Sequence, residues 1–347
     1  MKQFYSLASI LIALLHLQLL PTAVSNSKQV PKDFSKVGSW VVNNIKGYNQ
    51  RKSDASKGIP HIALDKRLAF AEDCVRVITV AKHAFADFQT ITDAIHSIPV
   101  DNKQRTIIWI NGGEYWEKIT INSSKPFITF YGDPGDMPKI VFNGTASQYG
   151  TVYSATVAVE SNYFMAVNVA FVNAAPMPDV NRTGAQAVAM RISGDKAAFH
   201  NCQFVGFQDT LCDDTGRHLF KDCYVRGTVD FIFGNGKSLY LNTTIESVAE
   251  GTGVITAQAR QNVTEDSGFT LYTAALQGSA TTLTLAVHGR RGLGWTAYYG
   301  EYKCRGPGAS SSGRVKYAKM LSDEEAKPFL SMTYINGNKW LIPPPKF

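Results

Sequence analysis

Two aspartates and two glutamines in the middle of the chain are spaced as members of one catalytic site would be. Gln186 precedes Asp209 by 23 residues, Gln208 stands directly before Asp209, and Asp230 follows 21 residues later. Both aspartates lie among apolar neighbours, in VGFQDTL and GTVDFIFG. Burying a lone carboxylate there costs several kcal/mol unless it is paired or hydrogen-bonded. The spacing therefore favours a site in which the two acids meet.

Such a pair of acids has a definite chemistry. Two carboxylates roughly 5 Å apart push their pKa values apart, so that one stays protonated while the other ionises. One site then holds both an acid and a nucleophile. The alternative is that Asp209 and Asp230 cap turns, as Asp often does. Spacing alone favours neither interpretation.

An internal repeat is what must position these residues. The stretches AAFHNCQFVGFQDT, HLFKDCYVRGTVDF and SLYLNTTIESV align at intervals of 21 and 20 residues. The aligned sets are Phe199, Phe220 and Tyr240; Asn201, Asp222 and Asn242; and Phe204, Val225 and Ile245. The earlier stretch FMAVNVAFVNAA places Ala166, Asn168 and Phe171 correspondingly. This period predicts an all-β fold, a parallel β-solenoid whose equivalent positions stack about 4.8 Å apart. A leucine-rich repeat fold has the same period, but the regular leucines it needs are missing. A β-sandwich whose strands align by accident is the alternative to the solenoid.

The sequence predicts three segments along the chain. Residues 1–25 have a charged start, an apolar core and the small-residue sequence Ala-Val-Ser, which is typical of a secretory signal. A membrane anchor is the alternative, but the apolar run is short of the roughly 20 residues that span a bilayer. We expect residues 26–75 to form an N-terminal arm with one or two short helices. From residue 76 to 347 we expect the solenoid, with a strand in VITVAKHA, a helix in FQTITDAIHSI, and strands in TIIWI, KITI and FITFYG.

Composition and cysteine usage narrow the function. The 347 residues are 44% hydrophobic and 18% charged, with a net charge of +7. This dilute positive excess suits an anionic polymer, not a nucleic acid, which calls for a clustered basic stripe. Sequons at Asn122, Asn143, Asn181, Asn242 and Asn262 fit a secreted glycoprotein. No CxxC or Cys/His cluster has metal-ligand spacing. Cys212 and Cys223 either pair or are both buried thiols, and thiols are favoured.

Four ordered blocks, GGEYWEK, GAQAVAMR, GFQDTL and GTVDFIFG, resemble the signature blocks of plant pectinesterases. The resemblance runs from about Val77 to Gln258 and resumes at YGEYKCRGPGA and LSDEEAKPFL. It implies a right-handed parallel β-helix that removes methyl esters from cell-wall homogalacturonan without a metal or cofactor. It also implies a secreted monomer of the short type, without the N-terminal inhibitor-like domain. The partners it implies are pectin and a proteinaceous pectinesterase inhibitor, and neither a nucleic acid nor a membrane. The roles it implies are nucleophile for Asp230, proton donor for Asp209, oxyanion-stabilising amides for Gln186 and Gln208, and groove aromatic for Phe233.

The chain departs from the family after the nucleophile. The family's Leu-Gly-Arg-x-Trp block is disrupted, because Trp295 stands five residues beyond Arg290 where two are expected. In the family this Arg holds the nucleophile ionised and the Trp contacts substrate. Arg290, or Arg291 beside it, is the candidate cation. Strands expected between Trp295 and Tyr299 are absent, which predicts unpaired strand edges. The alternatives are a catalytically impaired pectin-binding relative and a glycoside hydrolase that uses the same two acids.

Overall fold

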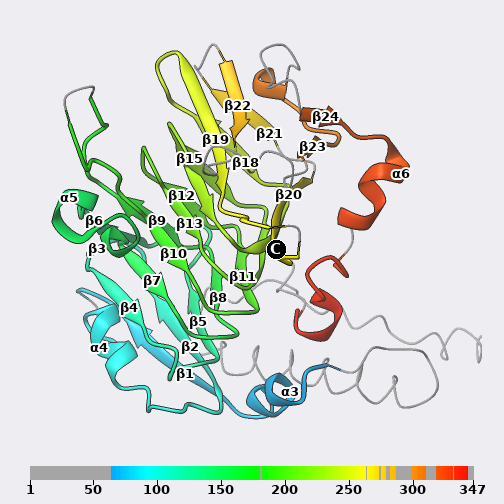
Figure 1. The fold of residues 1–347 in the computed structure, drawn as a ribbon. Coiled ribbons are helices and arrows are strands. Elements are labelled where there is room, and N and C mark those ends of the chain that lie inside the picture. Colours follow the sequence, from blue (N-terminus) through cyan, green and yellow to red (C-terminus); the bar gives the residue numbers. More distant parts are fainter. Residues whose placement is uncertain are drawn as a thin grey trace, which may run out of the picture. The chain divides into compact units, whose positions relative to one another are not determined.

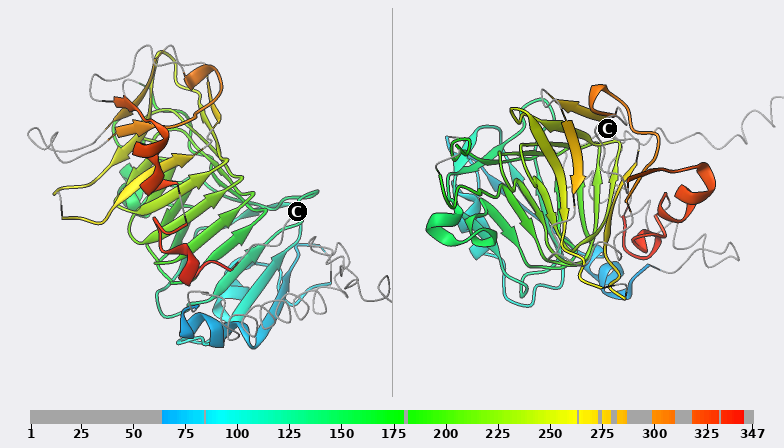
Figure 2. Two further views of the ribbon diagram at one scale, coloured as in Figure 1. Left: turned by 90° about the vertical axis from the view of Figure 1, so that its right-hand side faces the viewer. Right: turned by 45° about the horizontal axis from the view of Figure 1, so that its top comes forward.

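Three parallel β-sheets wind around one core in a right-handed parallel β-helix (Figures 1 and 2). The computed structural model describes residues 64–83, 85–179, 182–262, 264–272, 275–278, 282–286, 299–309, 318–330 and 332–342. These residues all fall within one unit, Val41–Ile342. Figure 2 shows successive coils stacked from the blue N-terminal strands to the yellow and orange C-terminal strands. The predicted solenoid is confirmed.

Each coil contributes one strand to each sheet. Sheet A contains, in spatial order, β1 (Val75–Val80), β2 (Arg105–Ile110), β5 (Ile128–Tyr131), β8 (Met165–Val167), β11 (Ala197–His200), β14 (Arg217–Lys221), β17 (Lys237–Leu241) and β20 (Gly268–Tyr272). Sheet B contains β3 (Glu114–Trp116), β6 (Lys139–Phe142), β9 (Ala170–Asn173), β12 (Gln203–Val205), β15 (Tyr224–Gly227), β18 (Thr244–Ser247) and β21 (Ala275–Gly278). Sheet C contains β4 (Ile119–Ile121), β7 (Val157–Val159), β10 (Met190–Ile192), β13 (Leu211–Asp213), β16 (Ile232–Gly234), β19 (Thr252–Gln258) and β22 (Thr282–Ala286).

The helices are short and lie outside the coils. They are α3 (Lys66–Glu72), α4 (Ile91–His96), α5 (Ala146–Tyr149), η2 (Val152–Ser154), η3 (Pro307–Ala309), α6 (Asp323–Ala326), η4 (Lys327–Phe329) and η5 (Gly337–Lys339). Two further strands, β23 (Tyr299–Glu301) and β24 (Ala318–Met320), pair with each other. No helix within the described ranges is long and apolar enough to cross a membrane.

The core is built on the aromatic repeat found in the sequence. Phe199 pairs with Phe220, and Phe220 pairs with Tyr240, in direct register on sheet A. Their rings stack nearly parallel, with centroids 4.8 and 4.5 Å apart. The second aligned set, Phe204 and its partners, has the same direct register on sheet B. Identical inward positions therefore stack coil upon coil, which is why the period was visible in the sequence.

The aligned polar set forms a ladder at the turns between sheets A and B. Asn168, Asn201, Asp222 and Asn242 all adopt left-handed backbone conformations, with φ between 51° and 57°. Asn201 Nδ2 donates to Asn168 Oδ1 at 2.9 Å, and Asn242 Nδ2 donates to Asp222 Oδ1 at 2.7 Å. Asn and Asp tolerate this conformation better than other residues with a side chain. The repeat of these residue types is thus a repeat of one turn.

Predictions for the N-terminal third are confirmed where the structure describes it. The strand expected from Val77 is β1, and the helix expected over FQTITDAIHSI is α4. Thr90 caps α4, since its Oγ1 accepts from the backbone N–H of Asp93 at 3.1 Å. One short helix of the predicted arm is α3. The predicted signal and residues 26–63 lie outside the described residues.

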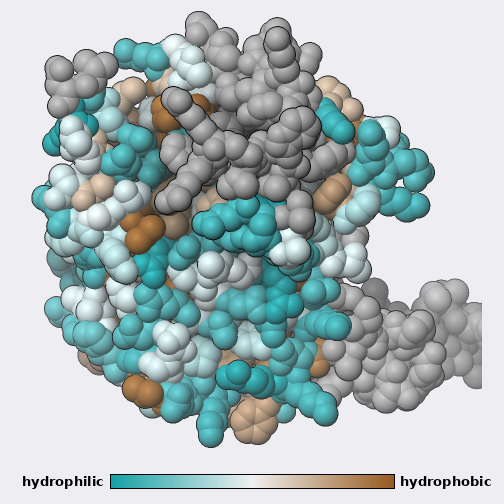
Figure 3. Space-filling model, in the orientation of Figure 1, coloured by the Kyte–Doolittle hydropathy of each residue, from teal (hydrophilic) through white to brown (hydrophobic). Residues whose placement is uncertain are grey.

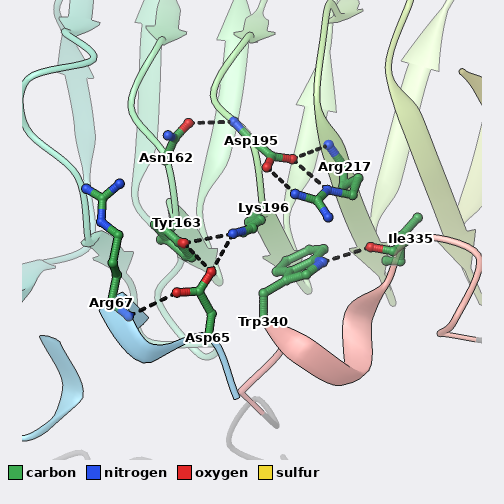
Figure 4. Close-up of polar contacts among 9 residues, drawn as sticks. All are labelled: Asp65, Arg67, Asn162, Tyr163, Asp195, Lys196, Arg217, Ile335 and Trp340. Carbon is green, nitrogen blue, oxygen red and sulfur yellow. Dashed lines mark hydrogen bonds and ion pairs between the residues drawn. The ribbon is translucent and has the colours of Figure 1, made fainter. Parts of the chain in front are cut away.

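The two ends of the described chain cover the outer face of sheet A (Figure 4). Leu68 of α3 and Trp340 near the C-terminal end pack in one apolar cluster with Ala198 of β11. Asp65, which caps α3, accepts hydrogen bonds from Lys196 Nζ at 2.6 Å and from the Tyr163 hydroxyl at 2.7 Å. Part of the outer face of sheet A is therefore covered by the protein itself.

Beyond the last complete coil the structure differs from the predicted open edge. Strands β20, β21 and β22 continue all three sheets. The backbone N–H of Leu276 in β21 then donates to Arg305 O at 2.7 Å, so this edge is partly paired. A cavity of about 330 Å³ remains between the coil and the C-terminal segment, lined in part by Gln258, Tyr302 and Phe329. The last coil is thus partly covered by the segment that follows the repeat in the sequence.

All five cysteines are thiols. Cys212 lies on the outer face of sheet C, whereas Cys223 lies in the core, within hydrogen-bond reach of Cys202. The prediction of buried thiols is confirmed for Cys212 and Cys223, and their pairing is wrong because they lie on opposite sides of the coil wall.

Candidate active site

Asp209 and Asp230 occupy the same place in successive coils. Leu211 of β13 pairs with Ile232 of β16, and each stands two residues after one of the aspartates. The backbone N–H of Asp209 donates to Val229 O at 3.2 Å, which ties the two turns together. Both aspartates are left-handed, with φ of 64° and 50°. They therefore lie at turns, as one interpretation of the sequence held, and next to each other, as the other held.

Asp209 keeps its proton to a much higher pH than an ordinary aspartate. Burial raises the pKa of Asp209, and the charge of Asp230 raises it further, to about 7. An ordinary Asp has a pKa near 3.8. Because one ionised carboxylate disfavours ionisation of its neighbour, the pair holds one proton over a wide range of pH.

A buried threonine holds the turn that carries Asp209. Thr210 Oγ1 donates to Arg226 O at 3.0 Å and to Phe207 O at 3.1 Å. It thereby connects the coil of Asp209 to the next coil, which carries Asp230. The sequence analysis missed this role, whose only signal was a hydroxyl residue directly after the acid.

The two glutamines lie on neighbouring coils next to the acids. The backbone N–H of Ala187 donates to Gln208 O at 3.1 Å, and the N–H of Ala146 donates to Gln186 O at 2.8 Å. Both side chains are half-buried. Within the described part of the chain, neither side-chain amide hydrogen-bonds to the protein. Their N–H groups are therefore available to an oxygen atom of a substrate.

An apolar strip runs along the outer face of sheet C beside the acids. Its members are Val152, Ala155, Ala158, Val188, Cys212 and Phe233. Phe233 of β16 pairs with Cys212 of β13 at the Asp230 end of this strip. Where it is not grey, the face of the molecule drawn in Figure 3 is mostly hydrophilic, with isolated hydrophobic residues.

Arg191 is a cation on this face that the sequence analysis did not single out. It lies in β10, aligned with Cys212. Its Nη2 donates to Glu160 Oε1 at 2.7 Å, and its guanidinium lies 5.5 Å from the ring centroid of Tyr153. The signal that could have found it is the register, because Arg191 stands 21 residues before Cys212.

The remaining predicted site residues, Arg290 with its alternative Arg291, and Trp295, lie outside the described residues. Within the described ranges no group of three or more His, Cys, Asp or Glu side chains is arranged to hold a metal ion. The described residues contribute two carboxyl groups and two side-chain amides to the candidate site.

Comparison with known proteins identifies the family of the chain. The family model described as Pectinesterase matches residues 77–295. The chain is 43% identical to "Probable pectinesterase 50" of Arabidopsis thaliana, over 93% of this chain and 94% of that protein. It is also 43% identical to "Pectinesterase 1" of Olea europaea, over 94% of each. The solved structure "Pectin methylesterase from Carrot" matches with a TM-score of 0.66 at 28% identity, covering 76% of this chain and 94% of that one.

Proposed function

Because the chain belongs to the pectinesterase family, we propose that it hydrolyses the methyl esters of pectin to pectate and methanol. The single observation that carries this proposal is the pairing of Asp209 with Asp230, in which the pKa of Asp209 is raised to about 7. A carboxyl group that remains protonated beside an ionised one provides a proton donor and a nucleophile within one coil spacing, about 4.8 Å.

The proposed reaction has two steps. The Asp230 carboxylate attacks the C6 carbonyl carbon of a methylated galacturonate, and the negative charge that develops on the carbonyl oxygen is stabilised by N–H groups of Gln186 and Gln208. The C–O bond to the methoxy group breaks as Asp209 donates its proton, and methanol leaves. Asp209, now a carboxylate, accepts a proton from a water molecule that attacks the acyl-enzyme anhydride. This releases galacturonic acid, which loses its proton to solvent, and regenerates the Asp230 carboxylate and protonated Asp209.

The substitution Asp230→Asn tests the assignment. We expect methanol release from methyl-esterified pectin to fall by several orders of magnitude, as it does when other covalent catalysts lose their nucleophile. The circular dichroism spectrum should be retained and the unfolding midpoint should not fall, because Asn also tolerates the left-handed backbone of this turn. Methanol is measured by coupled oxidation, and reducing ends are measured on the same samples. New reducing ends from the unsubstituted protein would instead indicate a glycoside hydrolase.

The matched control is Asp222→Asn. Asp222 has nearly the same backbone conformation as Asp230, with φ of 55° against 50°. It lies in the polar ladder between sheets A and B, so its substitution should leave methanol release unchanged. Equal turnover by the Asp230→Asn variant and the unsubstituted protein would refute the proposed nucleophile.

We further propose that the protein acts outside the cell in the plant cell wall, on the support of its predicted signal and sequons. Asn122 and Asn143 are exposed, as carriers of a glycan must be. A monomeric state and a proteinaceous pectinesterase inhibitor stay predictions.

A further inference from the structure

A histidine and an aspartate that the proposed reaction does not use are buried at the corner between sheets C and A. His218 of β14 and Asp213 of β13 are both 0% exposed. His218 Nδ1 lies 2.6 Å from Asp213 Oδ1, and His218 Nε2 lies 3.0 Å from Gly194 O. A carbonyl oxygen can only accept, so Nε2 carries a hydrogen. A second hydrogen lies between Nδ1 and the carboxyl group, whichever of them holds it, so the buried pair has no net charge.

The second oxygen of the Asp213 carboxyl group is bonded from the next coil. The hydroxyl of Tyr240 in β17 donates to Asp213 Oδ2 at 2.7 Å. Burial, together with the neighbouring Asp213, raises the pKa of Tyr240 well above its usual value, so this hydroxyl keeps its hydrogen. A Cβ atom at Gly236 would lie 2.1 Å from Asp213 Oδ1, so the glycine leaves the room that the carboxyl group fills. We call His218, Asp213, Tyr240 and Gly194 O the corner network.

The corner network joins the three coils that carry the proposed catalytic residues. Three of its members each follow one of these residues along the chain, across one strand of sheet C: Gly194 follows Gln186, Asp213 follows Asp209, and Tyr240 follows Asp230. The strands crossed, β10, β13 and β16, are three residues long and pair in register. Three residues of strand span roughly 10 Å. The network therefore holds one end of the short strands whose other end holds the acids.

The charged groups on the outside of this corner are engaged separately. Arg217 pairs with Asp195, as Figure 4 shows, and Asp214 Oδ2 lies 3.9 Å from Arg191 Nε. At the opposite corner, Thr210 links the coils of the two acids through its hydrogen bond to the next coil. The spacing of the two acids is thus held from both ends of β13, by Thr210 at one end and by the corner network at the other.

We propose that His218 is a positioning residue for the reaction, one that fixes the distance between Asp209 and Asp230 from the far end of β13. This inference rests on the proposed function for the roles of the two acids. His218 is buried away from substrate and acts through Asp213, and Tyr240 carries the constraint to the coil of Asp230. The more closely the two coils are held, the stronger is the repulsion that keeps a proton on Asp209. Because the pair of His218 and Asp213 has no net charge, its own effect on that proton is small.

The test is the pKa of Asp209 in His218→Gln, followed through the carbon-13 resonance of its carboxyl group, which is assigned by its loss in Asp209→Asn. A glutamine amide has a donor on one side only, so one of the two contacts of His218 is lost. We expect the pKa of Asp209 to fall by about 0.4 units, the change in repulsion when roughly 1 Å is added to a separation of about 5 Å at an effective dielectric constant of about 20. The alkaline limit of kcat/KM for pectin should move down in pH by the same amount, a shift that a loss of folded protein alone does not produce.

Two more variants separate positioning from stability. Tyr240→Phe keeps the stacked ring and removes only the bond to the coil of Asp209, so it should lower the pKa in the same direction even if His218→Gln does not fold. The double variant Asp213→Asn with His218→Gln can rebuild every bond without charge, because the asparagine amide donates to the glutamine oxygen and the glutamine amide donates to Gly194 O. We expect it to restore the pKa of Asp209. A double variant that keeps the lowered pKa would overturn the positioning role.

His200→Gln is the matched control. His200 is a buried histidine of sheet A, one coil earlier in β11 and 2% exposed, but within the described part of the chain its Nε2 has no hydrogen-bond partner. Its substitution should leave the pKa of Asp209 unchanged, whatever it does to stability. An equal shift in this control, or an unchanged pKa in both Tyr240→Phe and His218→Gln, would overturn the proposal. The titration does not depend on turnover, so absence of methanol release from the unsubstituted protein would refute the proposed function and leave this comparison intact.

Discussion

The raised pKa of Asp209 predicts that the active site destabilises the fold at neutral pH. In the folded chain the pKa of Asp209 is about 7, against 3.8 for an ordinary Asp. Between these two values the folded protein keeps the proton and the unfolded chain has lost it. The free energy of unfolding therefore falls as pH rises from about 4 to about 7, and stays at the lower level above pH 7.

The size of this effect follows from the shift. A difference of about 3 pKa units at 1.36 kcal/mol each gives about 4 kcal/mol. Asp209 is half-buried, so solvent screens part of this, and we expect about 2 to 4 kcal/mol. Asp209→Asn removes the ionisable group but keeps its shape. The variant should match the unsubstituted protein in stability near pH 4 and exceed it by this amount at pH 8, while losing esterase activity.

Urea unfolding followed by tryptophan fluorescence at pH 4, 6 and 8 measures the difference. Asp222→Asn is a control of opposite sign. Burial works to raise the pKa of Asp222, but hydrogen bonds from Asn242 and Lys221 outweigh it and lower the pKa below the usual value. Removing that group should therefore cost stability at neutral pH. A stability gain for Asp209→Asn that is the same at pH 4 and pH 8 would refute the reasoning.

Two further predictions concern activity and the core. The first step consumes the proton of Asp209, so kcat/KM for pectin should fall about tenfold per pH unit above pH 7. Initial rates of methanol release between pH 5 and 9 measure this dependence. A flat profile would exclude Asp209 as the proton donor. Phe220→Ala should lower the free energy of unfolding by about 4 kcal/mol, because it removes the middle ring of a buried stack. Phe85 is fully exposed, so Phe85→Ala should change the free energy of unfolding by no more than about 0.5 kcal/mol. Urea titration at pH 6 compares the two, and similar losses would contradict the packing argument.

The coils could be predicted from the sequence because each turn repeats the same physical requirements. Phe199 and Phe220 fill the same inward position, and Asn201 and Asp222 supply the same left-handed turn. A period of about 20 residues then fixes which residues are neighbours across coils. The adjacency of Asp209 and Asp230 follows from the same period.

The rest of the site could not be predicted because it lies where the period is interrupted. The excursion that carries Tyr149 and Tyr153 leaves the coil between β6 and β7, and no repeat specifies where it returns. Its position depends on hydrogen bonds to a later coil, such as that from Ala146 to Gln186. The contact between Lys118 and Tyr149 is a product of that excursion. No pattern in the sequence indicates this contact.

The two turn ladders of the coil explain how one backbone device can serve both stability and chemistry. Between sheets A and B, Asp222 alternates with Asn201 and Asn242, so its charge is hydrogen-bonded and the pKa falls. Between sheets B and C, Asp209 and Asp230 follow each other with no amide residue between them, and burial together with the charge of Asp230 raises the pKa of Asp209. The backbone is left-handed at both turns, which differ in burial and in the order of residue types. The electrostatic cost thus falls at the turn where the proposed reaction needs an acid that keeps its proton, and the hydrogen-bonded ladder between sheets A and B helps to offset it.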